Sequence, residues 1–143
     1  MGEQKLFFDD VKVGDEAPVT SHTLTRTDLV RYAGASGDYN PMHHDEVAAT
    51  AAGQPSVFGH GMFSMGLLGS ALTDYVGVGN LTHYRVRFAR QTWPDELLSS
   101  KIVVTAKRED AGKNLVDFAV TLSNSEGEDK VVGEATAALP RKG

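Results

Sequence analysis

The chain has 143 residues, of which 41% are hydrophobic and 23% charged, and its formal net charge is −5. This length fits a single core, so we expect residues 1–143 to form one domain, and the negative charge argues against nucleic-acid binding. The sequence has no cysteine and no long apolar run, and its first five residues lack the apolar core of a secretory signal. We therefore expect no disulfide, no thiolate nucleophile, no membrane insertion and a cytoplasmic location.

The first third of the chain predicts a strand followed by a capped helix. Residues 19–24 are typical of a first strand. Thr25 and Asp28 then form a capping-box pattern, in which a threonine at the cap precedes an acid by three residues. An apolar stripe follows, and we expect this helix to end near Gly34 or Gly37.

Two more helices are predicted in the middle of the chain. Residues 45–52 are rich in alanine and are followed by Gly53, which favours a helix end. Residues 61–75 carry no charge before Asp74 and are apolar all round, which predicts a buried helix rather than a surface one.

The rest of the chain is mostly strand. Stretches rich in β-branched or apolar residues predict four consecutive strands at residues 81–89, 97–107, 115–122 and 130–139. This order of elements predicts an α+β domain in which an antiparallel sheet packs on the long central helix. A single curved sheet around one apolar helix also suggests that a second subunit covers what the sheet leaves exposed.

The segment after the first helix carries the residues best suited to acid–base chemistry. Asp38 and His43 lie on either side of the turn-forming pair Asn40-Pro41, directly after Gly37. Because histidine ordinarily titrates near neutrality, Asp38 and His43 could form an acid–base pair. Alternatively, Asp38 caps a turn and His43 is a partly buried ring, and the residues alone leave both interpretations open.

Two glycines flank His60 immediately before the predicted buried helix. Free N–H groups at the start of that helix could stabilise negative charge on a carbonyl oxygen, and Gly61 would let a ligand reach the backbone. The alternative is a tight connection into the helix, with His60 as its cap.

Other candidate sites are less well supported. His43 and His44 are adjacent, and adjacent residues rarely bind one ion, so we expect no metal site. Ser64 and Ser70 lack the Gly-x-Ser-x-Gly pattern of esterases, which argues against a serine nucleophile.

Three arginines, Arg85, Arg87 and Arg90, lie on or just after one predicted strand. Alternation places Arg85 and Arg87 on one face, and directs Val86 and Phe88 toward the core. The arginines could contact the phosphate of a nucleotide-tailed or phosphopantetheine ligand, or they could form an ordinary solvated sheet face.

The pattern Gly-Asp-x-Asn-Pro-x-His at residues 37–43 resembles the hydratase motif of the MaoC-like dehydratases, which include (R)-specific enoyl-CoA hydratases and 3-hydroxyacyl-ACP dehydratases. The resemblance continues through His60-Gly61-Met62 and residues 84–88, so it spans most of the domain. In length the chain is similar to single-hotdog (3R)-hydroxyacyl-ACP dehydratase subunits of the mycobacterial type. The resemblance implies the hotdog fold, a curved antiparallel sheet wrapped around a central helix, working as a dimer.

The resemblance also assigns roles to residues. It implies Asp38 and His43 as the catalytic pair, Asn40 as a supporting residue, and Gly61 as the donor whose N–H polarises a thioester carbonyl, with His60 beside it in substrate binding. His43 would activate water at C3 of a 2-enoyl thioester, and Asp38 would help to deliver a proton to C2. The substrate would be an acyl-CoA or acyl-ACP thioester, the partner a second hotdog subunit, identical or different, and no metal or organic cofactor is implied.

Two other functions remain open at this point. A hotdog thioesterase would attack at C1, which the loop fits less well, and a non-catalytic acyl-binding subunit would need neither Asp38 nor His43. The chain also departs from the family pattern twice. A pocket serine of some members falls at Gly69, next to Ser70, and the usual Pro-Gly-Asp turn reads Pro-Asp-Glu at residues 94–96.

Overall fold

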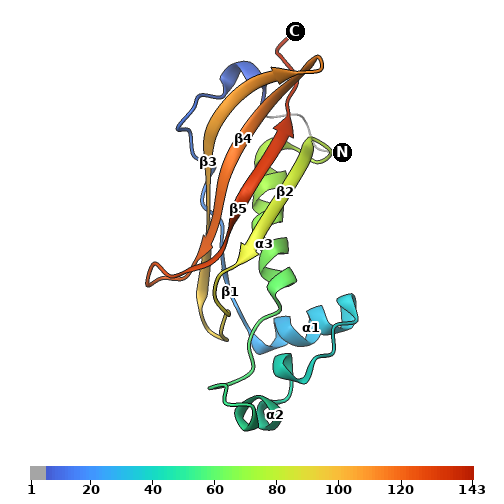
Figure 1. Ribbon diagram of the computed structural model, residues 1–143, viewed down its shortest axis with the longest axis vertical. Helices are drawn as coiled ribbons and strands as arrows, with labels where there is room; N and C mark the ends of the chain where they lie inside the picture. The colour runs from blue at the N-terminus through green and yellow to red at the C-terminus, as the bar shows by residue number, and fades with distance from the viewer. Residues whose placement is uncertain (1–5) are drawn as a thin grey trace.

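The computed structural model describes residues 6–143 and shows one antiparallel sheet curved around a long helix (Figure 1). In chain order the elements are the 3-10 helix η1 (Phe8–Asp10), β1 (Ser21–Thr23), α1 (Arg26–Ser36), the 3-10 helix η2 (Pro41–His43), α2 (Glu46–Ala51), α3 (Gly61–Val76), β2 (Leu81–Phe88), β3 (Leu97–Asp110), β4 (Lys113–Ser123) and β5 (Asp129–Ala138). The predicted α+β class is confirmed, and each predicted helix and strand is present close to its expected bounds.

The five strands follow the order β1-β3-β4-β5-β2, and all neighbouring strands are antiparallel. β2 lies at one edge and pairs with β5, where Gly133 stands opposite Val86. A Cβ on Gly133 would come within 2.0 Å of the Arg85 carbonyl oxygen. Glycine therefore permits the close approach of β2 to β5 at this point.

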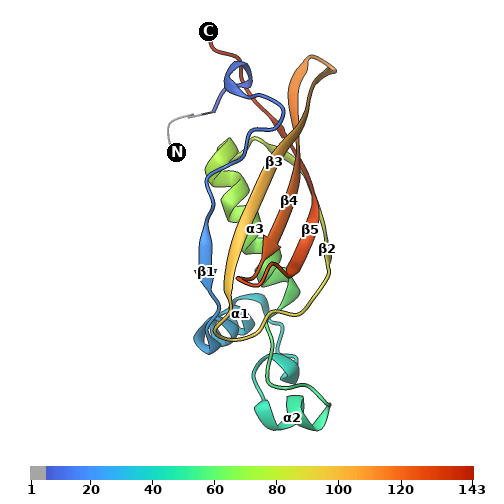
Figure 2. The ribbon, with the colours of Figure 1, turned by 90° about the vertical axis from the view of Figure 1, so that its left-hand side faces the viewer.

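The N-terminal segment covers the opposite edge of the sheet, beyond the short β1. The Gly14 amide donates a hydrogen bond to the Val104 carbonyl at 2.8 Å, so this segment is bonded to β3. Nearer the start of the chain, the Phe8 amide donates to the Pro140 carbonyl at 2.9 Å. Both ends of the described chain are therefore fastened at the same end of the sheet (Figure 2).

α3 packs against the sheet along one side only. Its inner side includes Leu68 and Leu72, which are fully buried. Its outer side is exposed along a stripe formed by Met62, Gly66, Ser70 and Asp74. The prediction of a helix buried all round is thus wrong for the single chain, because one sheet covers one side of a helix. Among residues 6–143, no helix is both long enough and apolar enough to cross a bilayer.

α1, η2 and α2 lie beyond one end of α3 (Figure 2). The predicted capping box of α1 is confirmed: the Asp28 amide donates to the Thr25 hydroxyl at 3.1 Å, and the Thr25 amide donates to the Asp28 carboxylate at 2.8 Å. α1 ends at Gly37, which has a φ of 75° and donates its amide to the Ala33 carbonyl. This left-handed conformation favours glycine, and it turns the chain out of α1 toward η2.

Candidate active site

The loop between α1 and η2 is shaped by the side chains of Asp38 and Asn40. The backbone N–H of Asn40 donates to one carboxylate oxygen of Asp38 at 3.2 Å, and the backbone N–H of Met42 donates to Asn40 Oδ1 at 3.1 Å. Pro41 then begins η2, at a position where its missing N–H costs nothing. The Asp38 side chain therefore caps a turn, which is one of the two interpretations that the sequence left open. This turn, which we call the corner, leads directly to His43.

This corner brings Asp38 and His43 together. His43 Nδ1 lies 2.7 Å from the Phe58 carbonyl oxygen and must donate to it, because a carbonyl only accepts. The neutral ring then has a free lone pair on Nε2, which lies 3.9 Å from a carboxylate oxygen of Asp38. The side chain of His43 is 10% exposed and that of Asp38 is 50% exposed. A buried proton acceptor thus faces an open carboxylate, with both able to contact a third molecule.

His60 joins this pair from the segment that precedes α3. Its Nε2 donates to the backbone carbonyl of Asp38 at 3.2 Å, and its ring stacks on that of His43 with 3.9 Å between the centroids. Burial lowers the pKa of His60, and its bond to the Asp38 carbonyl opposes that effect only in part. His60 is therefore a neutral, buried ring that packs the two segments together. This contact links residues 22 apart in sequence, and no local pattern signals it.

α3 begins at Gly61, directly after His60. The first amides of a helix have no acceptor within the helix, so the Gly61 N–H lies at the positive end of α3 with no partner inside it. A Cβ on Gly61 would lie 3.0 Å from the Phe88 ring, so glycine lets Phe88 cover this end. Phe88 itself is 50% exposed. Its ring faces the start of α3, on the side of the sheet that alternation predicts, but half of the side chain stays uncovered at the end of this edge strand.

Asp38, His43 and His60 each place a possible metal ligand within 4.8 Å of the others. Their arrangement does not suit an ion, however. Two stacked rings direct their lone pairs along nearly parallel planes rather than toward one point, and His60 Nε2 carries a proton that it donates to Asp38. His44, the neighbour considered from the sequence, donates from Nε2 to the Tyr39 carbonyl at 3.0 Å.

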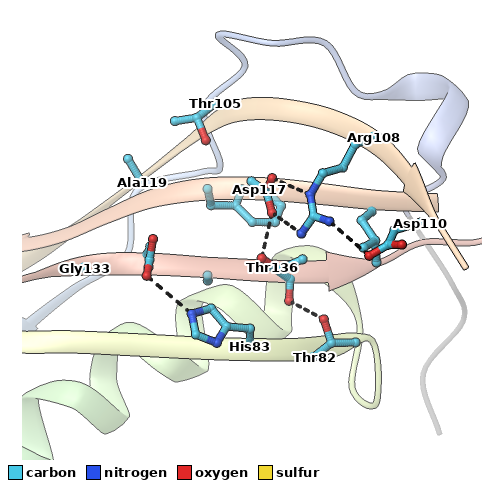
Figure 3. Close-up of a pocket in the computed structure, with 13 residues that line it drawn as sticks. Thr82, His83, Thr105, Arg108, Asp110, Asp117, Ala119, Gly133 and Thr136 are labelled. Atoms are coloured by element: carbon cyan, nitrogen blue, oxygen red, sulfur yellow. Dashed lines mark hydrogen bonds and ion pairs between the residues drawn. The ribbon is translucent and has the colours of Figure 1, made fainter. Parts of the chain in front are cut away.

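A separate hollow of about 750 Å³ lies on the face of the sheet away from α3 (Figure 3). Its charged side chains bind one another. Arg108 Nε donates to the Asp117 carboxylate at 2.9 Å, and the Thr136 hydroxyl donates to the same group at 2.7 Å. The bond from Arg108 lowers the pKa of Asp117. Asp38 and His43 are not among the lining residues, so the hollow and the acid–base pair are distinct places.

Arg85 and Arg87 line a shallow hollow on the outer face of β2, next to Glu134. They alternate with Tyr84, whose hydroxyl donates to the Met65 carbonyl of α3 at 2.7 Å on the inner face. The two arginines therefore share a face, as alternation predicts. Their contact with a phosphate stays a prediction.

The sequence from residue 10 to residue 127 matches the family model of the MaoC like domain. Over 139 residues the chain is 28% identical to the (R)-specific enoyl-CoA hydratase of Rhodospirillum rubrum, a match that covers 96% of this chain and 94% of that protein. It is also 39% identical over 82 residues to 3-hydroxyacyl-thioester dehydratase Y of Mycobacterium tuberculosis, covering 54% of this chain and 28% of that protein. The chain thus spans nearly all of the first relative and under a third of the second.

Solved structures show the same architecture. The unliganded R-hydratase PhaJ1 of Pseudomonas aeruginosa has a TM-score of 0.82 at 29% identity, with 95% of this chain and 86% of that chain covered. The truncated HadBC (3R-hydroxyacyl-ACP dehydratase) complex of Mycobacterium tuberculosis has a TM-score of 0.71 at 19% identity, with 87% and 95% covered. The hotdog fold expected from the sequence is thereby confirmed.

Proposed function

The chain belongs to the MaoC-like family, and we propose that it is a hydro-lyase that hydrates 2-enoyl thioesters to (3R)-hydroxyacyl thioesters and catalyses the reverse dehydration. The observation that carries this proposal is the free Nε2 of His43 beside the Asp38 carboxylate, close to the amide end of α3. Hydration of a conjugated thioester needs a base for water, a proton for C2 and a donor for the carbonyl oxygen.

We assign one residue to each of these needs. His43 Nε2 takes a proton from water as the water oxygen bonds to C3. The electron pair of the double bond shifts toward the thioester oxygen, where the Gly61 N–H and the positive end of α3 stabilise the negative charge. The proton that His43 took from water then passes from the imidazolium across the 3.9 Å gap to the Asp38 carboxylate and on to C2, which returns the imidazole and the carboxylate to their starting states.

Asn40 and His60 support this arrangement without touching the reacting atoms in the mechanism. Asn40 caps η2, and His60 fixes the Asp38 backbone. Both therefore hold the substrate-binding corner in shape, and a 1 Å displacement of a catalytic group is enough to lower a rate about 10²-fold.

We infer that the substrate is a CoA or acyl-carrier-protein thioester, since relatives are named for each of them. We also infer a second hotdog subunit, identical or different. Three large apolar side chains near Asp38 and the start of α3 stay at least half exposed: Tyr39, Met62 and Phe88. Such a cluster is typical of a surface that binds a partner or an apolar ligand.

The test is turnover of a short-chain enoyl-CoA, followed by loss of the ultraviolet absorbance of the conjugated thioester. Asp38→Asn and His43→Gln should each lower kcat by about 10²- to 10⁴-fold, because each removes a proton-transfer group. His44→Gln is the matched control, because His44 neighbours His43 but binds the Tyr39 carbonyl. Its kcat should stay near the wild-type value.

Other outcomes separate the remaining functions. Near-full activity of Asp38→Asn or His43→Gln would show that the site is wrongly assigned. Release of free thiol without a hydrated product would indicate a thioesterase. An inactive pure chain that a second hotdog subunit makes active, with the activity insensitive to Asp38→Asn, would indicate a non-catalytic acyl-binding subunit.

A further inference from the structure

Lys130, the second residue of β5, is buried although its side chain carries a charge. It is 2% exposed, its Nζ donates to the Gln91 carbonyl at 2.9 Å, and it forms an ion pair with Glu96 at 3.0 Å. Lysine is seldom fully buried unless it is paired. Because replacing a buried ion pair with apolar residues is often neutral or stabilising, stability alone does not explain this pair.

Glu96 extends the network to the loop between β2 and β3. The Trp93 amide donates to one carboxylate oxygen at 2.7 Å, and Asn124 Nδ2 donates to the other at 2.7 Å. Burial by itself would raise the pKa of Glu96, but the bonds from Asn124, the Trp93 amide and Lys130 outweigh it and lower the pKa. Residues 91–96 are thereby bound as one unit around a carboxylate and an ammonium group.

The loop of residues 91–96 packs against Phe58 and Gly59, the segment whose carbonyl binds His43. The Gly59 amide donates to the Thr92 carbonyl at 2.8 Å, and the Trp93 ring meets the Phe58 ring edge-on with 5.8 Å between the centroids. A Cβ on Gly59 would come within 2.2 Å of the Thr92 hydroxyl, so the two segments lie in close contact. The Phe58 carbonyl, held in this way, is the acceptor for His43 Nδ1.

We propose that Lys130 and Glu96 form a positioning pair for His43: they fix the loop that sets the direction of the Phe58 carbonyl. That carbonyl holds the proton on Nδ1 and so leaves Nε2 as the base. Neither residue of the pair touches the reacting atoms. The inference rests on the proposed function for its kinetic readout, but its structural readout is independent of turnover.

Lys130→Met removes the ammonium group and keeps a similar volume. Its kcat should fall by about 10²-fold, the effect of a catalytic group misplaced by about 1 Å, while KM changes by less than about threefold. In a plot of kcat against pH, the acid limb should move to lower pH. The reason is that the His43 imidazolium is less stable once the Phe58 carbonyl no longer accepts its Nδ1 proton. Asp38 and His60, the other polar groups that face His43, are unchanged.

Lys101→Met is the control, because Lys101 lies in β3, is exposed and pairs only loosely with Glu16 at 3.9 Å. Its kcat and pH profile should equal those of the wild type. A purely structural role of Lys130 would lower the amount of active enzyme by the same factor at every pH, with the acid limb unmoved. That result would overturn the proposal.

A second variant covers the case in which Lys130→Met does not fold with Glu96 left unpaired. The double variant Lys130→Met/Glu96→Gln leaves no unpaired buried charge, and it should show the same shift of the acid limb. In ¹⁵N spectra of the imidazoles, His43 should hold its proton on Nδ1 in the wild type and lose this preference in the folded variant. A folded variant with the wild-type tautomer overturns the proposal, even if the wild type hydrates no thioester and the proposed function fails.

Discussion

At the scale of single residues, the candidate site consists of two imidazoles in different surroundings. His43 keeps one nitrogen free beside Asp38, whereas His60 is fully buried and bonded to the Asp38 backbone. Their rings stack, so a change of charge on one is felt by the other. The neutral state of His60 therefore favours a His43 that can accept a proton during the reaction.

The lowered pKa of His60 predicts how stability depends on pH. Between that lowered value and about 6.5, the value of an unperturbed histidine, the unfolded chain binds more protons than the folded one. The free energy of unfolding should therefore rise with pH in this window and fall as pH drops below about 6.5. Urea denaturation at several pH values should show a shallower slope for His60→Gln than for the wild type, with His44→Gln as the unchanged control. Equal slopes would contradict the assignment.

The sequence predicted part of this site and missed part of it, for a physical reason. Asp38 and His43 lie five residues apart, and the Asn40-Pro41 turn between them is local chemistry that the residue types reveal. His60 reaches Asp38 only after α1, η2 and the start of α3 have packed together. The family resemblance implied a substrate-binding role for His60, which stays a prediction, whereas its stacking on His43 depends on tertiary packing that no local pattern encodes.

At the scale of elements, periodicity and turn chemistry predicted α3 and the strands well, because caps and hydrophobic patterns are local. Burial was harder to predict, since it depends on how many layers cover a helix. The turn at residues 94–96 shows how far local sequence predicts backbone conformation. Asp95 takes a φ of 76° where the family pattern has glycine. Asp95 thus adopts the left-handed conformation that favours glycine, which aspartate tolerates better than most residues.

Two glycines of α3, Gly66 on its exposed side and Gly69 facing Tyr84, should respond differently to replacement by alanine. Nothing lies within 4 Å of a Cβ added to Gly66, so Gly66→Ala should raise the free energy of unfolding by about 1 kcal/mol through helix propensity. A Cβ on Gly69 would lie 3.2 Å from the Tyr84 ring, whose hydroxyl is bound to Met65, so Gly69→Ala should gain less or lose stability. Urea denaturation measures both. Destabilisation by Gly66→Ala would show that this side of the helix is covered in solution.

At the scale of the whole molecule, β2 is joined to the rest of the sheet through β5, and the two strands lie close together at Gly133. Gly133→Ala would push a methyl group into the Arg85 carbonyl, and backbone atoms cannot turn aside as a side chain can. The variant should lose about 3 kcal/mol of stability in urea denaturation. Because Phe88 at the end of β2 covers Gly61, activity should fall as well. Gly34→Ala, with nothing within 4 Å of the new Cβ, is the control and should not be destabilised.

The two edges of the sheet also set how many neighbours the molecule can accept. In residues 6–143, the β1 edge is three residues long and continues into a segment bonded to β3, whereas β2 offers eight residues with no strand beyond them. An uncovered edge can receive another strand, and a covered one cannot. Only the β2 edge is therefore free to extend the sheet by another strand. Two copies that join through β2 use up both open edges and form a closed pair, and the N-terminal segment blocks the second attachment that a growing fibre would need.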